Sequence, residues 1–279
     1  MTPTIGFAFV PPDLNNVLLF LVAGSLAAML FSIAKAGFGG SVGILAIPLM
    51  IFACGDRTTL ALGIMLPMLI AADYIAVALW WRKWDPVAVL RLMPGAALGI
   101  LAAWAGLGAL RAWGVEGHEK LGEHALKLMI GLIALGFVGL RVLRWLRRTD
   151  FTFTPTWPRM LLIGAAAGVT STFAHAAGPV VAMYLLSLRM PKSRYVASTA
   201  ALFWLINHAK LPVYLHLGMI RPDTLVAAVP LLPAIVAGAL AGLFLHRLVG
   251  ERQFAGIVYG LLALAAGGLI YKAAEALWA

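Results

Sequence analysis

Two stretches of the sequence combine helix-breaking residues with side chains that can bind an ion. Residues 34–41 read Ala-Lys-Ala-Gly-Phe-Gly-Gly-Ser, and residues 173–179 read Phe-Ala-His-Ala-Ala-Gly-Pro. Glycine disfavours a continuous helix and allows a close approach of the backbone. Inside a lipid bilayer, the N–H and C=O groups freed by a break must find partners in protein or in a wet cavity. Paired breaks at corresponding points of two halves are typical of a transporter's binding site.

Polar side chains also interrupt the long apolar runs. A lysine at membrane depth costs roughly 2.5–3.5 kcal/mol on insertion scales, so Lys35 is expected either to face a polar interior or to extend to a nearby surface. Asp73 and Lys210 occupy corresponding positions in the two halves, which predicts an ion pair that is structural or part of a proton relay. Asn207 lies three residues before Lys210 and shares its helix face. His175 either bonds a carbonyl freed by the break or carries a coupling proton.

The composition is that of an integral membrane protein. Of the 279 residues, 62% are apolar and 11% are charged, and the mean hydropathy is +0.95. Soluble domains carry roughly 25% charged residues. The apolar runs show no polar alternation, which indicates membrane helices and excludes a transmembrane barrel. The formal charge of +10 does not indicate nucleic acid as a partner, because the basic residues lie in short loops between apolar runs.

Ten apolar segments form two halves of five. They span residues 14–34, 41–54, 59–82, 86–110, 125–146, 160–173, 177–188, 195–217, 222–249 and 252–274. A duplicated unit with an odd number of segments must take opposite orientations in the membrane, which predicts an all-α fold of two inverted-topology repeats. We expect a first repeat over residues 1–140, a basic cytoplasmic linker over 141–157 and a second repeat over 158–279.

The distribution of basic residues predicts the orientation. With the N-terminus outside, 13 Lys and Arg residues lie on the inner side and 6 on the outer side, and Lys35 and Lys210 lie at membrane depth. This excess on one side follows the positive-inside rule. We therefore expect an N-terminus on the periplasmic side.

Several segments are too short to cross a bilayer alone. Segments 41–54, 160–173 and 177–188 fall below the roughly 20 residues that a spanning helix needs. We interpret 14–54 and 160–188 as two glycine-broken helical hairpins that enter from opposite faces and meet near the midplane. Ten short, tilted full spans are the alternative.

The predicted anion site joins the two hairpin tips. Lys35 supplies charge, Ser41 and Ser171 can donate hydrogen bonds, and helices beginning near Ser41 and Gly178 would add partial positive charge. Ser and Thr at 170–172 are alternatively expected to bond back to their own helix. The full set of candidate binding residues is Lys35, Phe38, Gly39, Gly40, Ser41, Thr170, Ser171, His175, Gly178 and Asn207.

An enzyme is the weaker interpretation. Gly39-Gly40-Ser41 with His175 is similar to the Ser–His pair of intramembrane serine proteases, but Val42 stands where their motif has a glycine. The histidines and glutamates of residues 111–127 do not meet a metal-ligand spacing, and no cofactor motif occurs. We therefore expect no catalysis, no cofactor and no metal.

The chain resembles the TauE/SafE family of sulfite and organosulfonate exporters. The resemblance rests on Gly37-Phe38-Gly39-Gly40 with Pro48 downstream, on the duplicated halves, and on proline-led segments near Asp85-Pro86 and Arg221-Pro222. It covers roughly residues 14–274, and it departs from the family pattern at Ser41 and at 175–179.

The resemblance implies a secondary transporter of the bacterial inner membrane. Its substrates would be small sulfur-containing anions such as sulfite, sulfoacetate or related sulfonates, moved by alternating access and with a proton as a candidate coupling ion. An anion channel, or a carrier of unrelated organic acids, is the alternative. The expected partners are the small anion and the lipid bilayer.

Overall fold

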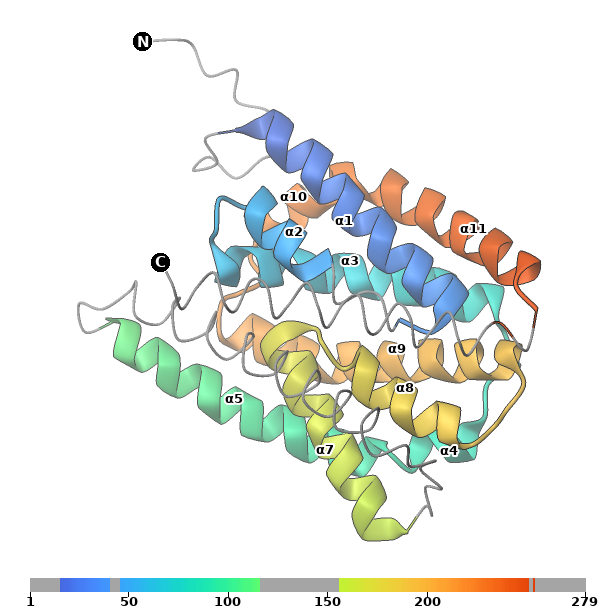
Figure 1. Ribbon diagram of the computed structural model, residues 1–279. Helices are drawn as coiled ribbons and strands as arrows, with labels where there is room; N and C mark the ends of the chain where they lie inside the picture. Colours follow the sequence, from blue (N-terminus) through green and yellow to red (C-terminus); the bar gives the residue numbers. More distant parts are fainter. Residues whose placement is uncertain (1–15, 41–45, 116–155, 251–252, 254–279) are drawn as a thin grey trace, which may run out of the picture.

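The computed structural model describes residues 16–40, 46–115, 156–250 and 253, and these residues form helices without strands (Figure 1). The helices are α1 Val17–Phe38, α2 Ala46–Ala53, α3 Thr58–Leu79, α4 Pro86–Leu90, α5 Met93–Val115, α7 Trp157–Ala174, α8 Gly178–Ser187, α9 Lys192–His216, α10 Pro222–Ala228 and α11 Leu232–Leu248, with a 3-10 turn, η2, at Val229–Leu231.

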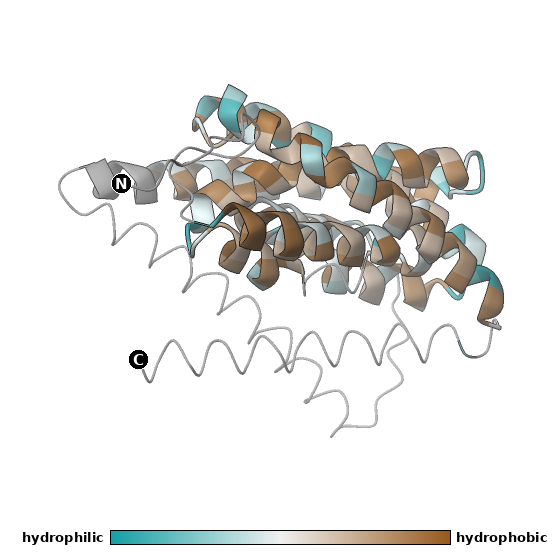
Figure 2. Cartoon of the chain, turned by 90° about the horizontal axis from the view of Figure 1, so that it is seen from above, coloured by the Kyte–Doolittle hydropathy of each residue, from teal (hydrophilic) through white to brown (hydrophobic). Residues whose placement is uncertain are grey.

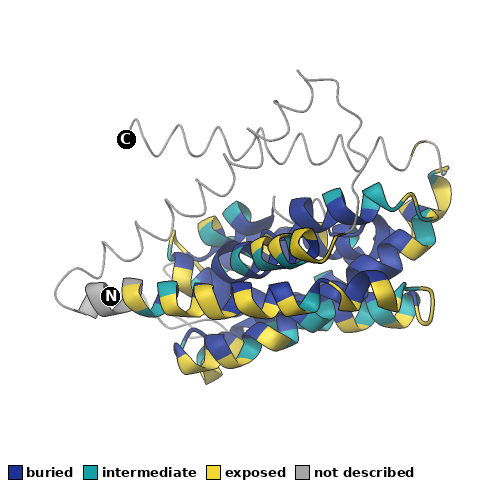
Figure 3. Ribbon diagram, turned by 90° about the horizontal axis from the view of Figure 1, so that it is seen from below, coloured by how far each residue is buried: buried dark blue, intermediate teal, exposed yellow. Residues whose placement is uncertain are grey.

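Among the described residues, four helical stretches are long and apolar enough to cross a membrane. They are Val17–Phe38, Thr58–Leu79, Pro86–Ala109 and Pro222–Leu248. Apolar colouring dominates the helices in Figure 2, and exposed residues lie on the outer sides of the bundle in Figure 3. On α1, for example, Leu18, Val22 and Leu26 repeat every four residues on one exposed face. Such a face is suited to lipid, so the chain is a helical membrane protein.

Two helices are much shorter than a bilayer is thick. α2 has 8 residues and α8 has 10, so at 1.5 Å per residue they reach only about 12 Å and about 15 Å. α1 and α7 precede them with 22 and 18 residues. The short segments predicted at 41–54 and 177–188 therefore correspond to short helices.

Three helix pairs hold the bundle together. α1 packs along α11, α5 packs along α7, and α3 lies beside α9 in the centre (Figure 1). Glycines bring the backbones of the outer pairs into contact: a Cβ on Gly168 of α7 would lie 2.2 Å from the Ala96 oxygen of α5. Small residues of this kind are typical of helix packing in membranes, where dispersion forces drive association.

Replacing Gly168 by alanine should therefore destabilise the bundle. The added methyl group meets a backbone carbonyl rather than a flexible side chain, so the helices must separate, at a cost of about 1–3 kcal/mol. The matched control is Gly108→Ala on α5, where an added Cβ meets nothing within 4 Å and should be neutral or slightly stabilising. Thermal unfolding in detergent measures both. Equal midpoints for the two variants would contradict the packing argument.

The observed helices correct several predicted boundaries. α1 runs through Lys35 and Gly37 and ends at Phe38, four residues beyond the predicted segment. The predicted helix start near Ser41 lies outside the described residues, and α2 is described from Ala46. Segment 86–110 is interrupted at 91–92, between α4 and α5. Segments 125–146 and 252–274, and most of the predicted linker 141–157, also lie outside the described residues.

Candidate functional site

The first half of the site is built at the end of α1. The helix stops because Gly39 and Gly40 adopt left-handed φ angles of 67° and 73°, and the N–H groups of both donate to the Ala34 carbonyl. Lys35 lies in the last helical turn, where a cation is favoured by the helix dipole. Its side chain is 6% exposed and leaves α1 toward α3.

Lys35 forms a buried ion pair with Asp73 of α3. The Lys35 amino group also donates to the Leu69 carbonyl at 3.1 Å. The second oxygen of Asp73 accepts a hydrogen bond from the Asn207 side-chain amide of α9. Asp73 is fully buried, so its charge depends on these two donors for compensation.

The second half of the site is built at the end of α7. This helix stops at Ala174, and His175 takes a left-handed φ of 49° while its N–H donates to the Ser171 carbonyl at 2.9 Å. A left-handed conformation is uncommon outside glycine, and such strained residues cluster at ligand sites and switches. α8 then begins at Gly178, as the sequence predicts.

Lys210 of α9 reaches this second helix end. Its amino group donates to the Ser171 carbonyl at 3.0 Å and to the Ser171 hydroxyl at 2.9 Å, and it lies 2.7 Å from His175 Nδ1. An ammonium group can only donate, so Nδ1 accepts. His175 Nε2 therefore carries the ring hydrogen and donates to the Leu62 carbonyl at 3.2 Å. The imidazole is neutral in this arrangement.

The two lysines are compensated very differently. Lys35 has a carboxylate partner, whereas within the described part of the chain Lys210 has only neutral partners. The predicted ion pair between Asp73 and Lys210 was therefore wrong in its partner, because Lys35 on the neighbouring helix reaches the carboxylate instead. Lys210 is 0% exposed, and among the described residues no carboxylate contacts its amino group.

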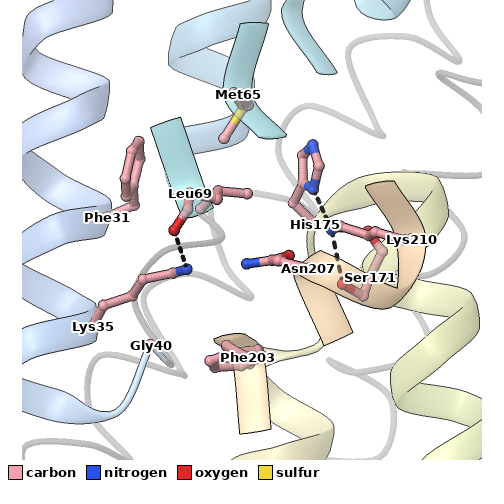
Figure 4. Close-up of a pocket in the computed structure, with 11 residues that line it drawn as sticks. Phe31, Lys35, Gly40, Met65, Leu69, Ser171, His175, Phe203, Asn207 and Lys210 are labelled. Carbon is pink, nitrogen blue, oxygen red and sulfur yellow. Dashed lines mark hydrogen bonds between the residues drawn. The ribbon is translucent and has the colours of Figure 1, made fainter. Parts of the chain in front are cut away.

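A cavity of about 30 Å³ separates these two groups. Figure 4 shows Lys35 reaching in from α1 on one side, Lys210 with Ser171 and His175 on the other, and Asn207 between them. In this conformation the volume holds roughly two water molecules, so the cavity must widen to bind a tetrahedral anion. Among the described residues, no group of three metal-ligating side chains occurs.

The structure brings most of the predicted site residues to this cavity. Those that line it are Lys35, Gly40, Ser171, His175, Gly178, Asn207 and Lys210. Phe38, Gly39 and Asp73 do not line it. Thr170 also turns away and donates to the Ala166 carbonyl at 2.7 Å, the alternative that the sequence left open.

Four apolar residues that line the cavity were not predicted from the sequence. They are Phe31, Met65, Leu69 and Phe203. Each lies four or eight residues before a polar site residue on the same helix: Phe31 before Lys35, Met65 and Leu69 before Asp73, Phe203 before Asn207. Helical periodicity places such residues on the same face and could have identified them.

These features define a helical membrane protein with a buried, lysine-lined cavity between two helix ends, and sites at helix ends of this kind are typical of transporters. Residues 18–269 match the family described as sulfite exporter TauE/SafE, and the chain belongs to that family. Membership makes it a transporter of a sulfur-containing anion and not an enzyme. Comparisons with curated proteins and with solved structures gave no match.

Proposed function

We propose that a small sulfur-containing anion, such as sulfite, sulfoacetate or a related sulfonate, binds between Lys35 and Lys210 and is exported across a bacterial inner membrane. One observation carries the proposal: the buried Lys210 faces the cavity with no contacting carboxylate among the described residues. A buried charge without a partner is unfavourable, and a bound anion would supply that partner.

The other cavity groups suit an oxyanion. Ser171 can donate through its hydroxyl, and the first turn of α8 at Gly178 presents the positive end of a helix dipole. Phe31, Met65, Leu69 and Phe203 form apolar walls that exclude water, which strengthens these charge interactions. The cavity would reject a metal cation, because its two lysines outnumber the single carboxylate of Asp73.

Two inverted repeats would account for the arrangement. The order α1, α2, α3, α4–α5 recurs as α7, α8, α9, α10–α11, and the contact of α1 with α11 corresponds to that of α7 with α5. Hydrogen bonds recur as well: Trp80 Nε1 donates to the Ala36 carbonyl at 2.9 Å, and Tyr214 OH donates to the Thr172 carbonyl at 2.7 Å. Each bond joins the last turn of the first helix of a repeat to a residue in, or directly after, the third helix of that repeat.

Alternating access fits this cavity better than an open channel does. Lys35 is 6% exposed and Lys210 is 0% exposed, so both charges are closed off in this conformation. We propose that the α1–α2 and α7–α8 units are hairpins whose tips meet at the cavity, and that one repeat moves against the other to open it.

A ligand screen and a flux assay test the function. Thermal shift of the purified protein with sulfite, sulfoacetate, taurine and carboxylate analogues should show stabilisation by the transported anion. In proteoliposomes, an internal load of that anion should accelerate uptake of labelled anion by counterflow. Flux that neither saturates nor shows counterflow would identify a channel instead. Stabilisation by carboxylates alone would indicate a carrier of organic acids.

The proposed orientation, with a periplasmic N-terminus, predicts a labelling pattern. Asp56→Cys after α2 should react with an impermeant thiol reagent from the periplasmic side, and Arg82→Cys and Arg189→Cys only from the cytoplasmic side. All three positions are exposed. The single natural cysteine gives little background, because burial raises the pKa of the Cys54 thiol to about 12. Labelling of Asp56→Cys and Arg189→Cys from one side would refute both the orientation and the hairpins.

A further inference from the structure

We propose that Asp73 takes up a proton when the cavity binds a doubly charged anion and stays ionised when it binds a singly charged one. The inference rests on the proposed function, because it needs an anion in this cavity. Asp73 does not line the cavity and acts through Lys35, which does. It is therefore a positioning residue, and its protonation state sets how much of the charge of Lys35 is available to the ligand.

The charges that surround the cavity can be summed. Lys35 and Lys210 contribute two positive charges, Asp73 contributes one negative charge, and His175 is neutral. A monoanion brings this sum to zero. A dianion leaves one uncompensated negative charge in a buried site, which is strongly unfavourable. One proton on Asp73 restores the balance and frees Lys35 to face the dianion.

Asp73 can accept this proton and keep Asn207 as its partner. One oxygen is paired with Lys35 and the other accepts from the Asn207 amide. A protonated Asp73 can donate to the Asn207 oxygen after the amide flips, and Lys35 keeps its bond to the Leu69 carbonyl. Neither change requires a helix to move.

His175 is the worse proton carrier, although the sequence alone suggested it for this role. Both of its ring nitrogens are already engaged, Nδ1 by the Lys210 ammonium and Nε2 by the Leu62 carbonyl. Protonation would place an N–H donor against the ammonium group and set two like charges 2.7 Å apart. The bond between Lys210 and His175 would have to break.

No other titratable side chain of the described residues competes for Asp73. Besides Lys35, the charged group of the described residues that interacts with it is Lys210 of α9. Of the remaining helices that pack on α3, α2 carries no titratable residue in its sequence. On α11, His246 bonds the Gly37 carbonyl, and on α10, Asp223 pairs with Arg221.

The test compares two tetrahedral anions of similar size. Methanesulfonate is a monoanion and sulfate a dianion throughout the range from about pH 5 to pH 8. Above the pH at which Asp73 ionises in the free protein, the affinity of the wild-type protein for sulfate should fall by up to about tenfold per pH unit, because binding takes up one proton. Affinity for methanesulfonate should stay constant. Calorimetry of the wild type in buffers with different ionisation enthalpies should show uptake of about one proton per sulfate and none per methanesulfonate.

Asp73→Asn separates this mechanism from proton uptake elsewhere. With a permanently neutral side chain, sulfate affinity should no longer depend on pH and should exceed that of the wild type at the high end of the pH range. Asp73→Glu should retain the pH dependence. If Asp73→Asn does not fold, calorimetry of the wild type still shows whether sulfate binding takes up a proton.

The outcomes separate the role of Asp73 from the proposed binding of an anion in this cavity. Three results would each overturn the role of Asp73. The wild type could bind sulfate without proton uptake, or it could bind methanesulfonate but not sulfate. The pH dependence of sulfate binding could also persist in Asp73→Asn. Loss of that dependence in His175→Gln but not in Asp73→Asn would place the proton on the histidine. Binding of neither anion by the wild type would overturn the proposed function itself.

Discussion

Replacing Lys210 by methionine is expected to weaken anion binding by about 2–5 kcal/mol, which is about 30-fold to several thousandfold in affinity. Lys210 is the one cavity-lining lysine without a contacting carboxylate among the described residues, so its whole charge is available to the ligand. Methionine keeps most of the side-chain volume and removes only the charge and the donors. Titration of the purified protein with the anion found by thermal shift measures the change.

A second lysine on the same helix provides the control. Lys192 donates to the His246 carbonyl at 2.9 Å and does not line the cavity. Lys192→Met should therefore leave the anion affinity unchanged, even where it lowers the thermal midpoint. Lys210→Arg should retain part of the affinity, because it keeps the charge while changing the shape of the donor. Unchanged affinity in Lys210→Met would refute the assignment of this cavity as the anion site.

The sequence predicted the two helix ends better than the contacts between their side chains. The glycines at 39 and 40 and the short segment 177–188 pointed to two helix ends, because their residue types disfavour a continuous helix. The break itself lies later than predicted, since Lys35 and Gly37 still belong to α1. A single glycine raises the free energy of a helix by about 1 kcal/mol, which the packing of Gly37 against Gly242 of α11 offsets.

The pairing of charges could not be read from the sequence. Asp73 and Lys210 occupy corresponding positions, and the repeat suggested that they meet. Which lysine reaches Asp73 depends on how α1 and α9 are placed around α3, and that placement follows from contacts between residues more than a hundred positions apart. Gly40 is one example: a Cβ on this residue would lie only 2.6 Å from the ring of Phe203 on α9.

Lys35→Met should destabilise the protein by about 3–5 kcal/mol, because within the described part of the chain it leaves the fully buried Asp73 carboxylate with Asn207 as its remaining donor. Lys210→Met should cost less, since it removes hydrogen bonds to neutral groups and leaves no opposite charge in contact without a partner. Lys35 is thus expected to contribute more than Lys210 to stability, and Lys210 more than Lys35 to anion binding. Denaturant or thermal unfolding in mild detergent measures both variants.

A double variant isolates the ion pair from the loss of packing. Lys35→Met combined with Asp73→Asn removes both charges and should recover a large part of the stability lost in Lys35→Met alone, because no uncompensated buried charge remains. The loss in the single variant should also shrink as the pH falls, since protonation neutralises the unpaired carboxylate. A double variant no more stable than the worse single variant, or a loss that is constant with pH, would show that Lys35 and Asp73 are close but not energetically coupled.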